Sequence, residues 1–326
     1  MAVTDSVFPL DFPRAYPQLE GSADLKTAPE DFVVVEEFDE ASFSGSGEHV
    51  CLKIRKRGQN TRWIAAALAE FAGVAERDIG FCGMKDRRAV TTQWFSVTHA
   101  DEWRMPASAI PDCEVLQVTR HQRKLRRGSH RGNHFTIRLR NVSSSIDDKL
   151  VDERLSLIAV NGVPNYFGEQ RFGIAGQNLL EADRLLRRGR QRKLGGRQGI
   201  FLSAARSYLF NRVLSARVKQ ENWSQMLEGE IEPQGPLWGR GRNSSRGELA
   251  ELESQALADF QAWCNAMEHL GLDQQRRDLL LRPSRFEWHW QGRDLYLSFA
   301  LPVGTYATSV LRELLEVNTP LPGAVL

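Results

Sequence analysis

The chain changes its sequence pattern twice, from strand-like to helical and back, and this order strongly constrains its fold. Apolar and polar residues alternate over His49–Arg57 and again over Phe135–Leu139, which is typical of half-buried strands. From about Ile146 the spacing of apolar residues becomes helical. A hairpin pattern then returns at Arg285–Leu301. The two ends are therefore predicted to share one mainly antiparallel sheet in an α+β protein, with the middle inserted as a domain.

Local spacing and capping residues predict the individual elements. Asn60 or Thr61 can cap a helix over Arg62–Phe71. Further helices are predicted at Ile146–Val160, Phe201–Lys219, Glu248–Leu270 and Thr305–Val317, and further strands at Phe32–Phe38, Gln93–Val97 and Glu114–Thr119. The segment 222–245, rich in Gly, Pro, Asn and Ser, is predicted to be a loop.

Length and composition limit the classes of protein to which the chain can belong. Its 326 residues, 41% of them apolar, allow one large or two ordinary folded domains. Stretches of 18 apolar residues are absent, and the first residues do not read as a signal peptide. Four scattered cysteines without CxxC spacing favour reduced thiols over disulfides or a zinc site. We therefore expect a cytoplasmic protein without a membrane segment or a bound metal, and nothing requires more than a monomer.

Positive charge is concentrated in three segments although the net charge is only +2. Acidic residues are absent between Glu114 and Asp147 and between Arg184 and Lys219. A smaller basic cluster lies within 53–57. Each run alone could be a solvated face, but three such runs with interleaved glycines and aromatics favour a nucleic-acid partner. The basic residues are Lys53, Arg55, Lys56, Arg57, Arg120, Arg123, Lys124, Arg126, Arg127, Arg131, Arg138, Arg140, Arg187, Arg188, Arg190, Arg192, Lys193 and Arg197.

One acidic residue, Asp86, stands among cations in the segment Gly83–Gln93 (GMKDRRAVTTQ). Lys85 precedes it, and two arginines follow it. An ordinary surface ion pair would explain such a triplet. Neighbouring cations also keep a carboxylate ionised and attract phosphate, and a group acting on a nucleotide needs both effects.

Two further segments combine aromatic, amide and basic side chains. Asn165–Gly173 (NYFGEQRFG) is either a buried turn or a segment that brings Arg171 near Asp86 or a phosphate. In Gly132–Phe135 (GNHF), Asn133 could read the edge of a base on which Phe135 stacks. The alternation of Phe135 with Ile137 and Leu139 equally suits a core position.

These segments together resemble the TruD family of tRNA pseudouridine synthases. The matching motifs occur in the family's order and span most of the chain. They are PEDFxVxE at Pro29–Glu36, GxKDRxAxTxQ at Gly83–Gln93, GNxF at Gly132–Phe135, NYFGxQRFG at Asn165–Gly173, SAARSxLFN at Ser203–Asn211 and LPxGxxATxxLRE at Leu301–Glu313.

The resemblance implies a discontinuous pseudouridine-synthase catalytic domain, residues 1–158 and 283–326, and an inserted, largely helical TRUD domain, residues 159–282. It implies that Asp86 is the catalytic aspartate. Phe32, Asn133 and Tyr306 fall where the family contacts the substrate uridine, and Phe135 falls where an aromatic residue lines the pocket. The family pattern is not matched after about Lys219, so the resemblance assigns no tRNA contact there.

The implied reaction isomerises uridine 13 in the D-arm of tRNA, after that nucleotide has been flipped out. It requires no cofactor, and the chain has no dinucleotide fingerprint or P-loop. Asp86 must be ionised, whether it bonds to C1′ or accepts a proton, and Lys85, Arg171 or another nearby cation would favour that state and bind substrate. Two alternatives remain from the residues alone: a tRNA-binding protein without catalysis, and a glycosidase that releases uracil.

Overall fold

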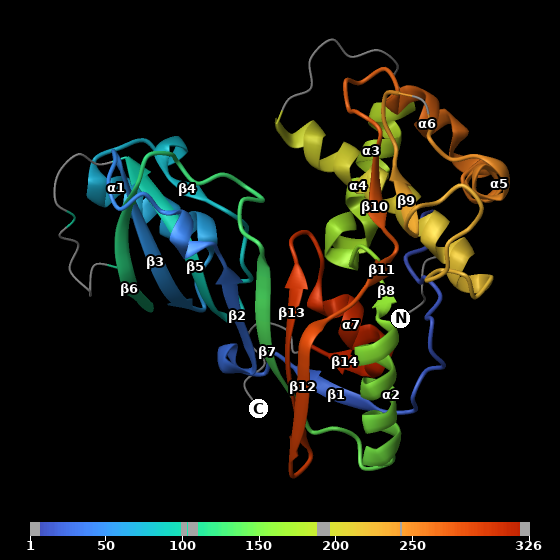
Figure 1. Cartoon of the computed structure of the whole chain (residues 1–326), viewed down its shortest axis with the longest axis horizontal. Coiled ribbons are helices and arrows are strands. Elements are labelled where there is room, and N and C mark those ends of the chain that lie inside the picture. Colours follow the sequence, from blue (N-terminus) through green and yellow to red (C-terminus); the bar gives the residue numbers. More distant parts are fainter. Residues whose placement is uncertain (1–6, 99–102, 104–109, 188–195, 242, 320–326) are drawn as a thin grey trace. The chain divides into compact units, whose positions relative to one another are not determined.

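The computed structural model describes residues 7–98, 103, 110–187, 196–241 and 243–319, and these form two compact units (Figure 1). The first, here called the helical unit, comprises Met1–Gln18, Glu153–Arg282 and Thr305–Leu314. The second, the sheet unit, comprises Leu19–Asp152, Pro283–Gly304 and Leu315–Leu326. Each unit thus collects segments that are far apart in the sequence.

The sheet unit is built on one large, mainly antiparallel sheet with the order β12-β13-β7-β2-β5-β3-β6. Its neighbours on this path are antiparallel except β2 and β5, which are parallel. The prediction that both ends of the chain share one sheet is confirmed, because the C-terminal hairpin β12–β13 joins this sheet through the pairing of β13 with β7. The strands are β1 Ser22–Leu25, β2 Phe32–Glu37, β3 His49–Arg57, β4 Gly80–Phe81, β5 Val90–Thr98, β6 Cys113–His121, β7 Gly132–Arg140, β12 Ser284–Gln291, β13 Asp294–Pro302 and β14 Glu316–Asn318.

Helix α1 (Thr61–Ala72) packs on the β3–β5 part of this sheet through a cluster of apolar side chains. The Asn60 side chain accepts a hydrogen bond from Arg62 N, so the predicted cap is confirmed. The helix ends at Gly73, whose φ of 66° is left-handed and therefore suits glycine. Thr61, the first residue of this helix, accepts a hydrogen bond from the backbone of Lys85, next to Asp86.

The helical unit has its own core, to which α3 and α4 contribute the most buried side chains. Two short strand pairs, β8 with β11 and β9 with β10, complete the unit. Helix α2 begins in the sheet unit and ends in the helical unit. The elements are α2 Asp148–Asn161, α3 Gln177–Arg187, α4 Gly196–Lys219, α5 Gly247–Ala256, α6 Gln261–Met267, α7 Ala307–Leu314, β8 Val163–Pro164, β9 Gln234–Leu237, β10 Gln275–Asp278 and β11 Leu280–Leu281.

Two predicted elements of this unit differ in the structure. The single helix predicted over Glu248–Leu270 is broken between α5 and α6, where Leu257 and Phe260 leave helical dihedral angles and the chain turns. The turn allows both Leu257 and Trp263 to enter the core. The predicted loop 222–245 contains β9, whose ladder partner β10 lies about 40 residues later, so local composition gave no signal. Helix α3 was not predicted, although its buried residues Leu179, Ala182, Leu185 and Leu186 recur at helical spacing.

The compact units also differ from the predicted domain boundaries. The helical unit includes α7 and the N-terminal segment, which were predicted to lie in the catalytic domain, and its middle segment ends at Arg282. The Glu313 carboxylate of α7 accepts hydrogen bonds from the backbone N–H groups of Ala15 (2.9 Å) and Tyr16 (3.2 Å), and Phe8 and Phe12 of the N-terminal segment belong to the core of this unit. Consequently Tyr306, at the start of this C-terminal segment, lies in the helical unit. Among the described residues, no helix is long and apolar enough to cross a membrane.

Candidate active site

The segment between β4 and β5 that carries Asp86 is held by a buried network of hydrogen bonds. The amide of Gln93 donates to Gly83 O (3.1 Å), and its oxygen accepts from the Thr61 hydroxyl (3.0 Å). The same hydroxyl accepts from Lys85 N (3.0 Å). Thr61 and Gln93 are fully buried. Gln93, at the end of the segment Gly83–Gln93, therefore holds the start of that segment in place, directly through Gly83 and indirectly through Thr61. The segment is therefore fixed on both sides of Asp86.

A buried ion pair anchors the residue next to Asp86. Lys85 Nζ lies 2.8 Å from Glu36 Oε2, and both side chains are almost completely buried. The other oxygen of Glu36 accepts a hydrogen bond from Trp94 N (3.1 Å). Lys85 was expected to bind substrate, but its ammonium points into the protein. In this structure Glu36 holds the ammonium, and the substrate contact expected of Lys85 stays a prediction.

The Asp86 carboxylate forms an ion pair with Lys26. About 37% of the Asp86 side chain is exposed, whereas the Lys26 side chain is largely covered. Oδ1 of Asp86 accepts from Arg88 N (2.9 Å), and the Arg88 guanidinium donates to Lys26 O (3.2 Å). The sequence suggested Arg171 or a basic residue adjacent to Asp86 as the paired cation. The structure supplies Lys26 instead, from a segment 60 positions earlier in the chain.

Opposing effects act on the pKa of Asp86, and the sum lowers it below its ordinary value. Burial is the largest single effect and raises the pKa. The charge and hydrogen bond of Lys26, the Arg88 N–H and the charge of Lys56 together outweigh it. Asp86 is therefore ionised at neutral pH and still partly open to a ligand.

Lys56 supports the backbone of the same segment. Its side chain is fully buried, and Nζ donates to Gln59 O (2.6 Å) and Asp86 O (3.1 Å). Burial lowers the pKa of Lys56 to about 8, although the Asp86 charge acts in the opposite direction. Lys56 had been counted in a basic surface cluster, which the structure corrects for this residue.

The Lys26 backbone adopts a left-handed conformation, with a φ of 59°, that a residue with a side chain rarely takes. Such conformations persist where surrounding contacts impose them, and they are frequent at functional sites. Here the contacts are those of Asp86, Arg88 and the Phe32 ring. Lys26 Nζ lies 4.1 Å from the centroid of that ring.

Aromatic side chains extend from this ion pair along one face of the sheet. The Phe32 and Phe135 ring centroids are 5.9 Å apart in an edge-on arrangement, and Phe135 stacks on Phe299 at 5.6 Å. Both Phe32 and Phe135 are more than nine-tenths buried. Both residues therefore occupy core positions, and Phe32 lies beside the Lys26 side chain that pairs with Asp86.

Asn133 lies on β7 opposite Glu36 of β2 and Leu301 of β13. Its side-chain oxygen is buried and has no hydrogen-bond partner among the described residues. A buried acceptor without a partner is unfavourable in the free protein and available to a ligand that donates a hydrogen bond. Asn133 and Phe135 point to the same face because they are two positions apart on one strand.

Arg171 and Tyr306 belong to the helical unit, where both lie near Phe167 of the NYFG segment. The Arg171 guanidinium donates to the Ser203 and Ser207 hydroxyls and lies 5.6 Å from the Phe167 ring centroid. The Tyr306 and Phe167 centroids are 6.3 Å apart. Arg277, which the sequence did not single out, lies 4.1 Å from the same ring. The structure thus gathers the predicted residues into two groups, one in each unit.

Much of the charge in the three basic segments is paired within the protein. Arg131, Arg138 and Arg140 pair with Asp39, Asp294 and Asp31. Lys53, Arg55 and Arg57 likewise pair with acidic residues. Arg123, Arg126 and Arg127 are exposed, whereas Arg188, Arg190, Arg192 and Lys193 lie outside the described residues, as does the side chain of Arg197. The basic segments are free of acidic residues along the sequence, but in the folded protein many of their cations lie next to acidic residues from other segments.

Comparison with known proteins gives consistent matches over nearly the whole chain. The family model for tRNA pseudouridine synthase D (TruD) matches residues 18–193 and 221–314. The tRNA pseudouridine synthase D of Cellvibrio japonicus (strain Ueda107) is 50% identical over 95% of this chain and 94% of its own length. That of Aeromonas salmonicida (strain A449) is 42% identical over 90% and 91%.

A solved structure shares the fold. A crystal structure from Methanosarcina mazei that carries the description putative tRNA pseudouridine synthase D (TruD) superimposes with a TM-score of 0.70 at 20% identity. The alignment covers 94% of this chain and 96% of that one. Together with the family model and the relatives, this shows that the chain belongs to the TruD family of tRNA pseudouridine synthases.

Proposed function

We propose that this protein is a tRNA pseudouridine synthase that isomerises uridine 13 in the D-arm of tRNA, with Asp86 as the catalytic carboxylate. The observation that carries the proposal is the ionised, partly exposed Asp86 held by Lys26 beside the Phe32 ring. The names of the relatives and the matched family support tRNA as the substrate. The uridine position and the role of Asp86 rest on the family motifs.

The reaction breaks the bond between C1′ and N1 and forms one between C1′ and C5, while N1 gains a proton and C5 loses one. Positive charge develops on the sugar when a glycosidic bond breaks, and a carboxylate next to it lowers the energy of that state. Asp86 can do so by bonding to C1′ or by accepting a proton, and both routes need the ionised form. Lys26 keeps Asp86 in that form.

The uracil must be held while it turns between the two bonds. Phe32 lies beside Lys26 and contacts Phe135, and we assign the apolar contacts of the uracil to the small exposed parts of these two rings. The Asn133 oxygen can accept a hydrogen bond from a ring N–H. Arg171 and Tyr306 stay predicted substrate contacts on the strength of the family motifs. The exposed arginines at 123, 126 and 127 can bind the phosphates of the flipped nucleotide's neighbours.

Chemical labelling of pseudouridine, read at single-nucleotide positions in tRNA treated with purified protein, tests the proposal. A new pseudouridine at position 13 is expected. Modification only at another position would contradict the uridine assignment. Free uracil would indicate a glycosidase, and bound but unchanged tRNA would indicate a binding protein without catalysis.

Replacing Lys26 is expected to change the pH dependence of the reaction. In Lys26→Met, burial remains the largest effect on Asp86 and raises its pKa, which in the wild type lies below the ordinary value of 3.8. The acid limb of kcat/KM against pH should therefore move to higher pH, because more carboxyl groups are protonated at a given acidic pH. Lys26→Arg, which keeps the charge, should restore most of the wild-type profile. An unchanged acid limb in Lys26→Met would contradict this role.

Asn133→Ala is expected to lower kcat/KM by roughly 10- to 100-fold, since a hydrogen bond to a buried group contributes about 1–3 kcal/mol. The measurement is steady-state pseudouridine formation on unmodified tRNA. Thr136→Ala is the matched control, because Thr136 is exposed on the opposite face of β7. Equal losses in both variants would argue that Asn133 only supports the strand.

A further inference from the structure

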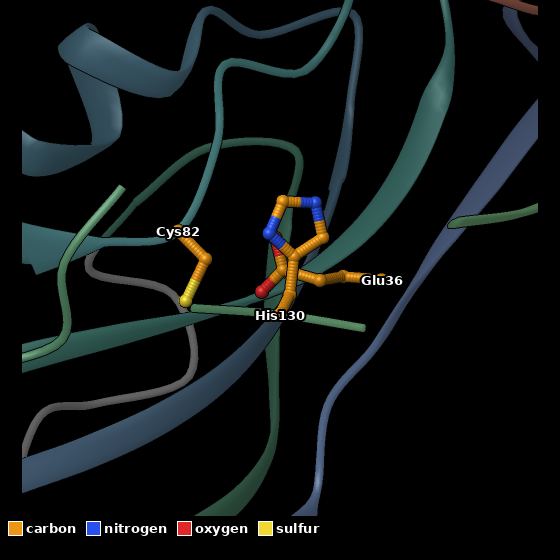
Figure 2. A group of neighbouring side chains, drawn as sticks. All are labelled: Glu36, Cys82 and His130. Carbon is orange, nitrogen blue, oxygen red and sulfur yellow. The ribbon is translucent and has the colours of Figure 1, made fainter. Parts of the chain in front are cut away.

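Three potential metal ligands that are distant in the sequence meet inside the sheet unit. Glu36 lies near the end of β2, Cys82 directly follows β4, and His130 precedes β7. One ligand atom from each lies within 4.8 Å of the other two, and all three residues are buried (Figure 2). The scattered cysteines gave no indication of such a group, because the sheet alone brings these residues together.

His130 supplies an independent indication that this cluster accepts a ligand. The residue is 7% exposed, and its Nδ1 atom has no hydrogen-bond partner among the described residues. Figure 2 shows the His130 imidazole ring beside the Glu36 carboxylate, and the Cys82 side chain to the left of both. A neutral imidazole with an unpaired nitrogen is a strong ligand for borderline metal ions.

We propose that Cys82, His130 and Glu36 bind a thiophilic divalent cation such as Zn²⁺. A thiolate, an imidazole nitrogen and a carboxylate oxygen are all zinc ligands, and a water molecule can complete a tetrahedral site. Zinc–ligand bonds of about 2.0–2.3 Å place ligand atoms roughly 3.3–3.8 Å apart, so the cluster must contract slightly. When the sulfur–zinc bond forms, the thiol proton passes to solvent.

The effect of metal binding on the rest of the protein depends on Lys85. Its ammonium lies 2.8 Å from Glu36 Oε2 and therefore competes for the carboxylate that the metal needs. A Cβ atom at Gly83 would lie 3.4 Å from both Lys85 Nζ and His130 Cε1, so both side chains border the same backbone. With Zn²⁺ bound, Glu36 and the Cys82 thiolate already balance its charge, and a buried Lys85 ammonium is left uncompensated. Lys85 must then leave its position or lose its proton.

Either change removes the buried ion pair that anchors Lys85, the residue next to Asp86. The metal site therefore acts as an inhibitory site, a consequence that rests on the proposed role of Asp86, whereas metal binding itself does not. The exposed turn at 126–129 lies against Cys82 and separates it from solvent. Its Gly128 N donates to Cys82 O (2.8 Å), and the Ser129 hydroxyl lies 3.2 Å from the Cys82 sulfur.

Titration of the purified metal-free protein with Co²⁺, a spectroscopic substitute for Zn²⁺, tests the site without an activity assay. We expect a thiolate-to-cobalt absorption band that saturates at one ion per chain, and competition by Zn²⁺. The band should disappear in Cys82→Ala, and affinity should fall at least about tenfold in His130→Leu. Cys113→Ala is the matched control, because Cys113 is a more accessible thiol of the same unit and should keep the band.

A missing band in the wild type, or a band lost only in Cys113→Ala, would overturn the site. Circular dichroism shows whether each variant is folded, and two variants with independent substitutions guard against misfolding.

The inhibition is tested by pseudouridine formation with and without Zn²⁺. Wild type should lose most activity at saturating Zn²⁺, and Cys82→Ala should keep it. Full activity of the zinc-loaded wild type would overturn the inhibitory role while leaving the site itself established.

Discussion

Asp86→Asn is expected to reduce pseudouridine formation by at least about 10³-fold while tRNA binding is retained. The substitution preserves the size of the side chain and removes the charge that both chemical routes require. It also leaves Lys26 without its anionic partner, but only a partly exposed pair is lost. Single-turnover labelling of pseudouridine measures the chemical step, and gel-shift titration measures binding.

Glu76→Gln provides the control for the loss of a carboxylate, since Glu76 is exposed in the same unit. It should retain wild-type activity. Substantial turnover by Asp86→Asn would contradict the catalytic role of Asp86. Loss of binding together with turnover would instead assign Asp86 to recognition of the RNA.

The second large effect is expected at the buried ion pair of Glu36 and Lys85. Glu36→Gln leaves the Lys85 ammonium buried without a counter-charge, which typically costs about 3–5 kcal/mol of unfolding free energy. The amide oxygen of the substituted side chain can still accept the hydrogen bond from Trp94 N, so the loss reports mainly on the charge. Urea unfolding measures stability, and pseudouridine formation should fall as well because Lys85 positions Asp86.

A double variant separates the effect on protein stability from the effect on the position of Asp86. In Glu36→Gln/Lys85→Met both charges are removed, and most of the lost stability should return, because a buried pair is costly to desolvate. Activity should remain low, since the link between β2 and the catalytic segment is still missing. Full recovery of activity would show that Lys85 is not a positioning residue.

Glu40→Gln is the matched control, because it breaks the ion pair with Lys53, which is 2.6 Å long but partly exposed. Such a pair contributes at most about 1 kcal/mol, so this variant should unfold nearly as the wild type does. A similar loss of stability in both single variants would argue against the importance of burial.

The local sequence pattern was sufficient to predict most helices and strands of the sheet unit. The alternation over His49–Arg57 and the Asn60 cap each depend on neighbouring residues, and both are confirmed. The return of the C-terminal hairpin to the first sheet could also be predicted, because its strand pattern needs a partner. By contrast, β9 pairs with a distant strand, and the break between α5 and α6 serves a core formed by several segments. Such features depend on contacts that no local window contains.

The sequence by itself determined the family and the residue proposed to carry the reaction, because both lie in contiguous motifs. Only the tertiary structure decided which cation pairs with Asp86, that Lys85 is buried against Glu36, and that Cys82 meets His130. It also showed that charges segregated along the chain are often paired in space. The physical reason is that charge interactions and metal ligation act over a few ångströms. Strand register, which joins residues tens of positions apart, sets those distances.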